Sequence, residues 1–202
     1  GISIATAADK IIVGANQTND NGTNSGSVYV YDANDLSATP TKLTAFDGEM
    51  NDQFGVNVHV SADYIFVCGQ NNTRGVYVYD ANTYSYIRNL VPDGLAFDDL
   101  FGLSVSTNED NVFISAMGDD DNGSNSGSVY VYDANDLSAT PTKLTAFDGA
   151  ASDRFGHSVA ATSDKIFVGA YLDDDNGENS GSVYVYDAND LSATPTKLTA
   201  FD

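Results

Sequence analysis

The stretch SGSVYVYDANDLSATPTKLTAFD occurs three times without a single difference, at 25–47, 126–148 and 180–202. A catalytic site is usually built once, from different residues that the fold brings together, so such repetition indicates a structural unit that has been multiplied. When the alignment of the repeats is extended toward the N-terminus of these copies, it includes segments that open with Phe-Gly, at 54–69, 101–116 and 155–170.

Four repeat units follow from this alignment, at 1–53, 54–100, 101–154 and 155–202. The second unit is shorter because one of its loops is trimmed. The first unit begins at Gly1, one residue inside the pattern, and the chain stops at Asp202, before another Phe-Gly. We therefore expect the chain to be a window of a longer repeat array.

The composition narrows the classes of partner. The chain has 29 Asp and Glu against 8 Lys and Arg, which gives a formal net charge of −21. This charge repels phosphate backbones and anionic lipid surfaces, and it attracts cations or basic proteins. No apolar run approaches the roughly 20 residues that span a bilayer. We therefore expect neither nucleic-acid binding nor membrane insertion.

Each unit reads as four short strands separated by turn-forming residues. In the last unit the strands are expected at 156–162, 165–171, 182–187 and 196–201. The connections between them are short enough for consecutive antiparallel pairing. No segment has the 3.6-residue apolar period of a helix that could cover a sheet, so the strands of one unit must be buried by strands of another.

The strand VYVYD recurs in all four units, at 28–32, 76–80, 129–133 and 183–187. Its alternation places Val on one face and Tyr on the other, which predicts that neighbouring units cover both faces and that the Tyr stripe is packing rather than a carbohydrate-stacking surface. A four-stranded antiparallel unit of about 50 residues, covered by copies of itself, describes a β-propeller blade. We predict an all-β protein of four such blades, with residues 1–202 forming one propeller or part of one.

The segments FG…VGA at 155–170 and DDDNGENSGSVYVYD at 173–187 resemble the FG-GAP repeat of integrin alpha-subunit propellers and of bacterial and algal surface proteins. The resemblance covers the whole chain, although the family's GAP reads GAN, CGQ, SAM and GAY here. It implies an extracellular propeller, typically of seven blades, that serves adhesion or ligand binding. Integrin-like members hold calcium between the FG and GAP segments, but this chain has only a tight turn there, such as ATSDK at 161–165, so those calcium residues cannot be carried over.

The acidic loop after the Gly-Ala segment offers a different metal site. It reads DDDNG in the third and fourth units, and oxygen ligands in a flexible loop suit Ca²⁺, with alternate residues pointing to one side. The candidate ligands are Asp119, Asp121, Asp173 and Asp175. The alternative interpretation is that Asp-Asn-Gly only forms a turn, because the aligned loops of the first two units lack most of these acids.

The remaining candidates for catalysis are weak. His59 and His157 fall at non-equivalent positions, and neither has a partner implied by its spacing. Ser158, in GHSVA, resembles a nucleophile elbow, but its position predicts a strand rather than a strand-to-helix turn. We therefore predict that the chain is not an enzyme.

Strand order also predicts where the charges lie. In a four-stranded meander the loops after the second and fourth strands emerge at one end, so the acidic DDDNG and AFDG loops should lie together. This reasoning places the lysines of the fourth strand, Lys42, Lys143 and Lys197, at the other end. The acidic end would then meet cations, a protein or glycan partner, or neighbouring subunits of an assembly.

Our leading hypothesis is a non-enzymatic extracellular or cell-surface scaffold or adhesion module, a fragment of a longer surface protein or fibre. Two alternatives stay open: a calcium-dependent ligand-binding head, and a propeller enzyme that uses the central channel. Fold alone does not decide among them.

Overall fold

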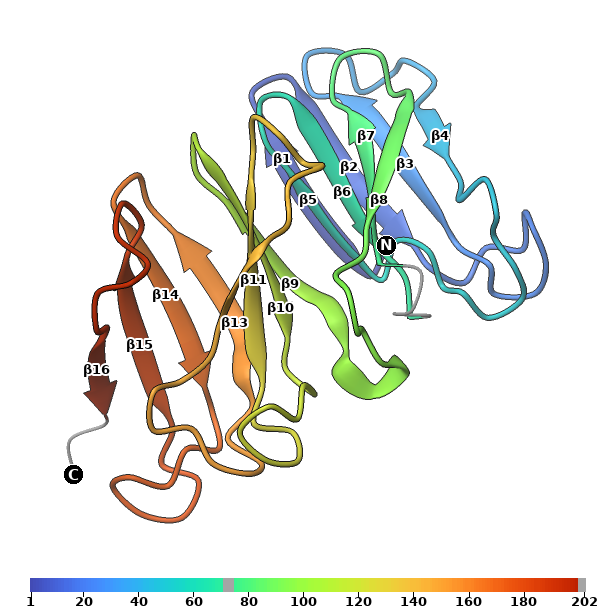
Figure 1. The fold of residues 1–202 in the computed structure, drawn as a ribbon. Helices are drawn as coiled ribbons and strands as arrows, with labels where there is room; N and C mark the ends of the chain where they lie inside the picture. Colours follow the sequence, from blue (N-terminus) through green and yellow to red (C-terminus); the bar gives the residue numbers. More distant parts are fainter. Residues whose placement is uncertain (71–74, 200–202) are drawn as a thin grey trace. The chain divides into compact units, whose positions relative to one another are not determined.

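The computed structural model describes residues 1–70 and 75–199, and these residues form an all-β structure, as predicted (Figure 1). The chain divides into two compact units, Gly1–Val91 and Pro92–Asp202. Each holds two four-stranded antiparallel sheets in which every strand pairs with its neighbour along the chain, as expected for blades. Among the described residues, no helix is long and apolar enough to cross a membrane.

The unit Gly1–Val91 contains the first two sheets. The first sheet consists of β1 (Ser3–Ala7), β2 (Lys10–Ala15), β3 (Ser27–Asp32) and β4 (Thr41–Leu43). The second consists of β5 (Asn57–Val60), β6 (Tyr64–Cys68), β7 (Val76–Asp80) and β8 (Tyr86–Leu90). Each sheet lies within one sequence repeat.

The unit Pro92–Asp202 opens with a short 3-10 turn, η2 (Phe97–Asp99), and contains the other two sheets. The third sheet consists of β9 (Phe101–Thr107), β10 (Asn111–Ala116), β11 (Ser128–Asp133) and β12 (Thr142–Leu144). The fourth consists of β13 (Phe155–Ala161), β14 (Lys165–Ala170), β15 (Ser182–Asp187) and β16 (Thr196–Thr199). The bounds in the last repeat are close to those predicted from the alternating pattern, and positions 200 and 201 of the expected last strand lie outside the described residues. Ser158 lies inside β13, which confirms the predicted strand.

Within each unit, the Val face of one sheet packs against the Tyr face of the next. In Pro92–Asp202, Val129 and Val131 of β11 share one core cluster with Tyr184 and Tyr186 of β15. The same arrangement is built in the other unit from Val28, Val30, Tyr77 and Tyr79. The prediction that the Tyr stripe is packing between repeats is therefore confirmed for these pairs of sheets.

The Phe-Gly dipeptide is where one repeat joins the repeat before it. Phe155 is fully buried, and its N–H donates to the carbonyl of Ser126 in the preceding repeat at 2.9 Å. Gly156 has φ +88°, and a Cβ built on it would lie 2.6 Å from the carbonyl oxygen of Ser128. Glycine is required here for two reasons: it tolerates the left-handed backbone, and it has no side chain to clash with the neighbouring strand.

Candidate functional site

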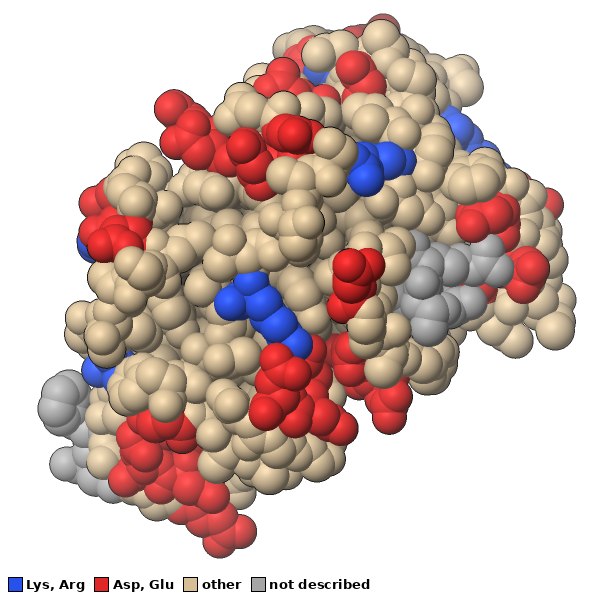
Figure 2. Space-filling view, in the orientation of Figure 1, with Lys and Arg blue, Asp and Glu red and all other residues tan. Residues whose placement is uncertain are grey.

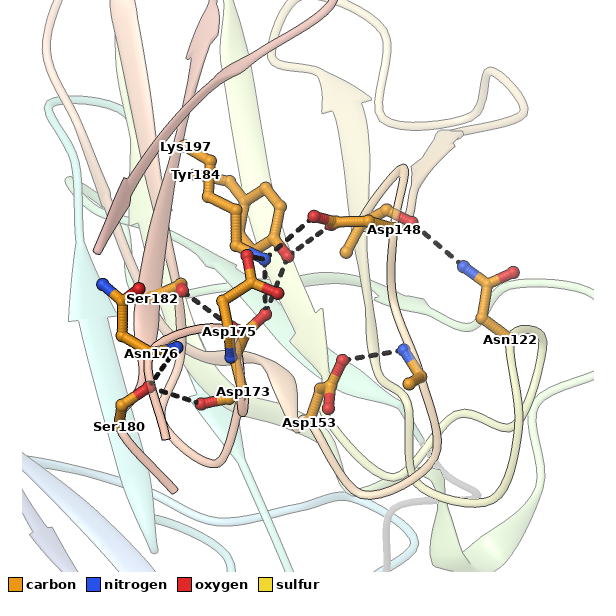
Figure 3. A network of polar contacts seen from close by, with 12 residues as sticks. Asn122, Asp148, Asp153, Asp173, Asp175, Asn176, Ser180, Ser182, Tyr184 and Lys197 are labelled. Atoms are coloured by element: carbon orange, nitrogen blue, oxygen red, sulfur yellow. Dashed lines mark hydrogen bonds and ion pairs between the residues drawn. The ribbon is translucent and has the colours of Figure 1, made fainter. Parts of the chain in front are cut away.

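The acidic loop of the last repeat connects β14 to β15 and folds back on itself. The carbonyl of Asp173 accepts the N–H of Gly181 at 2.8 Å and the Ser180 hydroxyl at 3.2 Å. The Asp173 carboxylate is buried and accepts the hydroxyls of Ser182 at 2.8 Å and Tyr184 at 3.0 Å (Figure 3). These contacts hold its side chain over the start of β15.

Lys197 supplies the cation for this loop. Its Nζ lies 2.8 Å from Asp173 Oδ2, 2.6 Å from Asp175 Oδ2 and 2.9 Å from Asp148 Oδ2. The Tyr184 hydroxyl also donates to Asp148 Oδ1 at 2.6 Å, and the ammonium lies 5.0 Å from the Tyr184 ring centroid. Figure 3 shows these five side chains converging, and we call them the Lys–Asp cluster: Asp148, Asp173, Asp175, Tyr184 and Lys197.

The strand register explains the position of Lys197. Lys197 of β16 is paired directly with Tyr184 of β15, so both side chains leave the same face of the sheet. The long lysine side chain then runs along the ring toward the loop. Asp148 comes from the connection between β12 and β13, so the cluster joins two consecutive repeats.

The third repeat builds the same contact from Lys143. Its Nζ lies 2.7 Å from Asp119 Oδ2 and 2.6 Å from Asp121 Oδ2, and 5.3 Å from the ring centroid of Tyr130. In the first repeat the Lys42 ammonium forms an ion pair with Asp20 and lies over the ring of Tyr29.

The second repeat departs from the pattern, because Asn89 occupies the lysine position opposite Tyr77. The Tyr77 hydroxyl still donates to an aspartate of the preceding repeat, Asp47, at 2.8 Å. Part of the aligned acidic loop of this repeat, residues 71–74, lies outside the described residues.

The ionisation of the cluster follows from its hydrogen bonds. Burial acts to raise the pKa of Asp173, but the hydrogen bonds from Lys197 and Ser182 outweigh it, and the pKa is lowered. For Lys197, burial acts to lower the pKa, but the hydrogen bonds to Asp173 and Asp175 outweigh burial, and the pKa is raised. Both groups are therefore charged at neutral pH, and the chain itself neutralises the buried carboxylate.

The candidate calcium ligands are brought together in pairs, Asp119 with Asp121 and Asp173 with Asp175, but around a lysine ammonium. Calcium takes six to eight oxygen ligands, whereas each pair offers its carboxylates to a cation that the chain already supplies. Among the described residues, no group of three or more His, Cys, Asp or Glu side chains is arranged to hold a metal ion. Calcium binding at these four residues stays a prediction, and it requires displacement of the lysine.

Calcium titration separates the two interpretations of the loop. Because Lys143 and Lys197 already neutralise the carboxylate pairs, we expect millimolar calcium to raise the melting temperature of the native chain only slightly. Differential scanning calorimetry with and without calcium measures this. A rise of several degrees that disappears in Asp173→Asn and Asp119→Asn would show instead that the ion displaces the lysines.

The predicted grouping of the loops is confirmed within Pro92–Asp202, but the predicted place of the lysines is wrong. Asn122 Nδ2 donates to the carbonyl of Ala146 at 3.1 Å, and the Ser152 N–H donates to the carbonyl of Ser124 at 2.8 Å, so both acidic loops lie at one end. The lysines of the fourth strands were expected at the opposite end, but Lys42, Lys143 and Lys197 reach the acidic end because their side chains run along the neighbouring tyrosine rings.

Sequence reasoning therefore missed Lys143, Lys197 and Asp148 as partners of the acidic loops. A signal for the lysines was present: wherever DDDNG occurs, TKL follows in the fourth strand. Pairing the VYVYD strand with TKL places Tyr opposite Lys. Nothing local indicates Asp148, because it reaches the loop from the preceding repeat.

Exposed acids remain at the loop tips after these contacts are made. In the described part of Pro92–Asp202 they include Asp120, Asp121, Asp174, Asp175 and Glu178. Figure 2 shows acidic side chains gathered in several clusters on the visible face, with few basic side chains among them. This surface attracts cations and basic proteins and repels anionic ligands.

A family model described as FG-GAP repeat matches residues 1–31, 84–132 and 140–186. These segments cover more than half of the chain and take in nearly all of the first three strands of the first, third and fourth repeats. All members of the Lys–Asp cluster except Lys197 lie inside the last matched segment. No curated protein matches the chain.

Proposed function

The chain belongs to the FG-GAP repeat family, and we propose that it serves as a non-enzymatic scaffold or adhesion module on the outside of the cell, within a longer surface protein or fibre. FG-GAP repeats are typical of adhesion and ligand-binding modules of extracellular or surface proteins. The more specific assignment, to a scaffold without catalysis, is supported by the partners of the buried polar side chains and by their repetition along the chain.

The observation that carries the proposal is the repetition of the buried polar clusters. An active site needs a set of groups that differ in pKa and role and that occur together once. Here the buried carboxylate of Asp173 is matched by Asp119, and Lys197 is matched by Lys143, at equivalent positions. Each buried group is held by a partner that fixes the loop to its sheet or to the next repeat, so this chemistry supports a rigid, modular framework.

We assign partner binding to the acidic loop end, which is the surface formed by the exposed acids Asp120, Asp121, Asp174, Asp175 and Glu178. Its exposed carboxylates leave a net negative field after Lys143 and Lys197 are counted. A field of one sign accelerates the encounter with a basic partner, and the association rate falls as salt increases. The partner we expect is therefore a protein or glycan-bearing surface with exposed basic groups, or a neighbouring subunit with such groups.

The proposal is tested by competition for attachment. We expect the soluble chain to inhibit attachment of the source cells to their natural surface, with an effect that weakens between low and high salt. The variant Thr23→Lys/Ser124→Lys/Glu178→Gln changes three exposed, equivalent tips of the acidic loops and should lose most of the inhibition. Cell counting on the surface measures it.

A matched control carries the same added charge at the other end of the sheets. Asn34→Lys/Asn135→Lys/Asn189→Lys places three lysines at equivalent exposed turns and should inhibit as well as the native chain. If the soluble chain leaves attachment unchanged, or if both variants lose inhibition equally, the assignment of the acidic end is wrong.

A further inference from the structure

Three equivalent loops of the chain have an Asn-Gly step at their tips, and a hydroxyl residue follows two of these steps. The first repeat reads NGT at 21–23 and the third reads NGS at 122–124, whereas the fourth reads NGE at 176–178. Asn-X-Ser/Thr is the acceptor sequence for N-linked glycans on the surface loops of secreted proteins. Two of the three loop tips therefore carry a candidate modification site.

The structure leaves room for a sugar at both acceptor asparagines. Asn21 lies in the loop between β2 and β3, Asn122 lies in the loop between β10 and β11, and both residues are exposed. The hydroxyl residues of the two acceptor sequences, Thr23 and Ser124, are exposed as well. A sugar attached at either tip would extend into solvent and away from the core between the sheets.

The backbone of each tip is held on both sides of the acceptor position. In the third repeat the Asn122 N–H donates to the Ser126 hydroxyl at 3.1 Å, and the carbonyl of Ser124 accepts the N–H of Ser152 at 2.8 Å. The first repeat makes the same two bonds at equivalent positions. These bonds use backbone atoms of the tip, so a sugar on the asparagine side chain leaves them in place.

The side-chain amide of each acceptor has a hydrogen to give up. Asn21 Nδ2 donates to the carbonyl of Ala45 at 2.8 Å, and Asn122 Nδ2 donates to the carbonyl of Ala146 at 3.1 Å. A primary amide carries two hydrogens, and an N-linked sugar replaces only one of them. The remaining N–H can still donate to the carbonyl, so the fold and the modification are compatible.

Burial excludes another acceptor sequence, NQT at 16–18. Asn16 is only 7% exposed, and its Nδ2 donates to Gln53 Oε1 of the next repeat at 2.8 Å. A sugar on Asn16 would have to separate the two repeats. The acceptor sequence NNT at 71–73 lies outside the described residues.

We propose that Asn21 and Asn122 carry N-linked glycans in the secreted protein. The donor is an oligosaccharide joined through its C1 atom to a lipid diphosphate. The bond from C1 to Nδ2 forms as the bond from C1 to the diphosphate oxygen breaks. The lipid diphosphate leaves with the electron pair of the broken bond, and Nδ2 gives up one proton, so neither an oxidant nor a reductant is required.

This inference adds a covalent modification to the proposed function, and it rests on the location outside the cell that is proposed there. In the unit Pro92–Asp202 the tip of the third repeat then carries a glycan, whereas the equivalent tip of the fourth repeat, at 176–178, carries none. A glycan adds bulk around the acids of its own loop. The carboxylates of this unit that stay open to a partner are therefore those of the fourth repeat, Asp174, Asp175 and Glu178.

The test is mass spectrometry of glycopeptides from the protein purified from its source cells. We expect the mass of an oligosaccharide on the peptides that contain Asn21 and Asn122, and no added mass on those that contain Asn16 and Asn176. An unmodified asparagine at position 21 or 122 overturns the assignment at that position. A glycan on Asn16 overturns the argument from burial.

Three variants expressed in the same cells test the assignment by sequence. Ser124→Ala should remove the glycan from Asn122 and leave the glycan on Asn21, whereas Ser124→Thr should keep both. Glu178→Ser creates an acceptor sequence in the equivalent loop of the fourth repeat and should add a glycan at Asn176. All three changes are at exposed positions, and thermal unfolding followed by circular dichroism confirms that the variants fold.

Two results with these variants contradict the proposal. A glycan that persists on Asn122 in Ser124→Ala would show that the sugar is not attached through the acceptor sequence. A Glu178→Ser variant that gains no glycan would show that an exposed tip with a hydroxyl residue is not sufficient. Inhibition of attachment by the chain produced without sugars tests the proposed function separately, so unmodified asparagines together with intact inhibition would overturn only the glycosylation.

Discussion

Replacing Tyr184 by alanine should lower the free energy of unfolding of the unit that contains it by about 3–5 kcal/mol. The side chain is fully buried, and it packs edge-on against Phe155 with 5.3 Å between ring centroids. Its single hydroxyl proton is shared between Asp148 Oδ1 and Asp173 Oδ2, so truncation removes apolar packing together with a charge-assisted hydrogen bond that serves two carboxylates. Urea denaturation followed by tyrosine fluorescence and circular dichroism measures the change.

Two related variants separate these contributions. Tyr184→Phe keeps the ring and removes only the hydroxyl, and we expect a loss of about 1–3 kcal/mol because two carboxylates lose a donor. Tyr29→Ala changes the equivalent residue of the first repeat, whose ring is only partly buried, and should cost clearly less than Tyr184→Ala. Equal losses for Tyr29→Ala and Tyr184→Ala would show that packing between repeats does not stabilise the Tyr face.

Replacing Lys197 by methionine should cost a similar amount, about 3–5 kcal/mol, because it leaves a buried carboxylate without its cation. The side chain of Asp173 is 4% exposed and that of Lys197 is 10% exposed, so water cannot replace the ammonium. Asp148 and Asp175 would then repel Asp173 within the same cluster. The double variant Lys197→Met/Asp173→Asn removes the unpaired charge and should recover much of the loss.

Lys165→Met is the control for the loss of a lysine alone. Lys165 pairs with Asp187 at 3.2 Å, but both side chains are more than 40% exposed, so the pair should contribute less than about 1 kcal/mol. If Lys165→Met and Lys197→Met destabilise the chain equally, burial does not strengthen the cluster.

The pH dependence of these variants gives a further test of the same cluster. The folded-state pKa of Asp173 is lowered, so its ionised form adds stability above the unfolded carboxyl pKa of about 4. This contribution is lost as the pH falls through the lower, folded-state pKa. The stability difference between the native chain and Lys197→Met should therefore shrink below about pH 4 and stay constant near neutrality.

The sequence by itself determined the repeat, the four-stranded sheets and the packing of Val faces on Tyr faces. These features are encoded locally: VYVYD alternates with the two-residue period of a strand, and short turn segments impose consecutive antiparallel pairing. The Phe-Gly dipeptide marked the last three repeats because its glycine needs a positive φ and close contact with the neighbouring strand. Each of these features depends on a few neighbouring residues, so a short stretch of the sequence is enough to predict it.

Only the tertiary structure decided what the acidic loops bind. The four candidate aspartates were correctly seen as pairs, but their partners, Lys143 and Lys197, come from a strand more than 20 residues further along the chain. Asp148 reaches Lys197 across 49 residues, from the preceding repeat. A local pattern states which groups carry charge, but the direction of a long flexible side chain depends on the ring and the carboxylates packed around it. That packing forms only after the strands of a repeat have paired, and the contact of Asp148 with Lys197 forms only when two repeats are stacked.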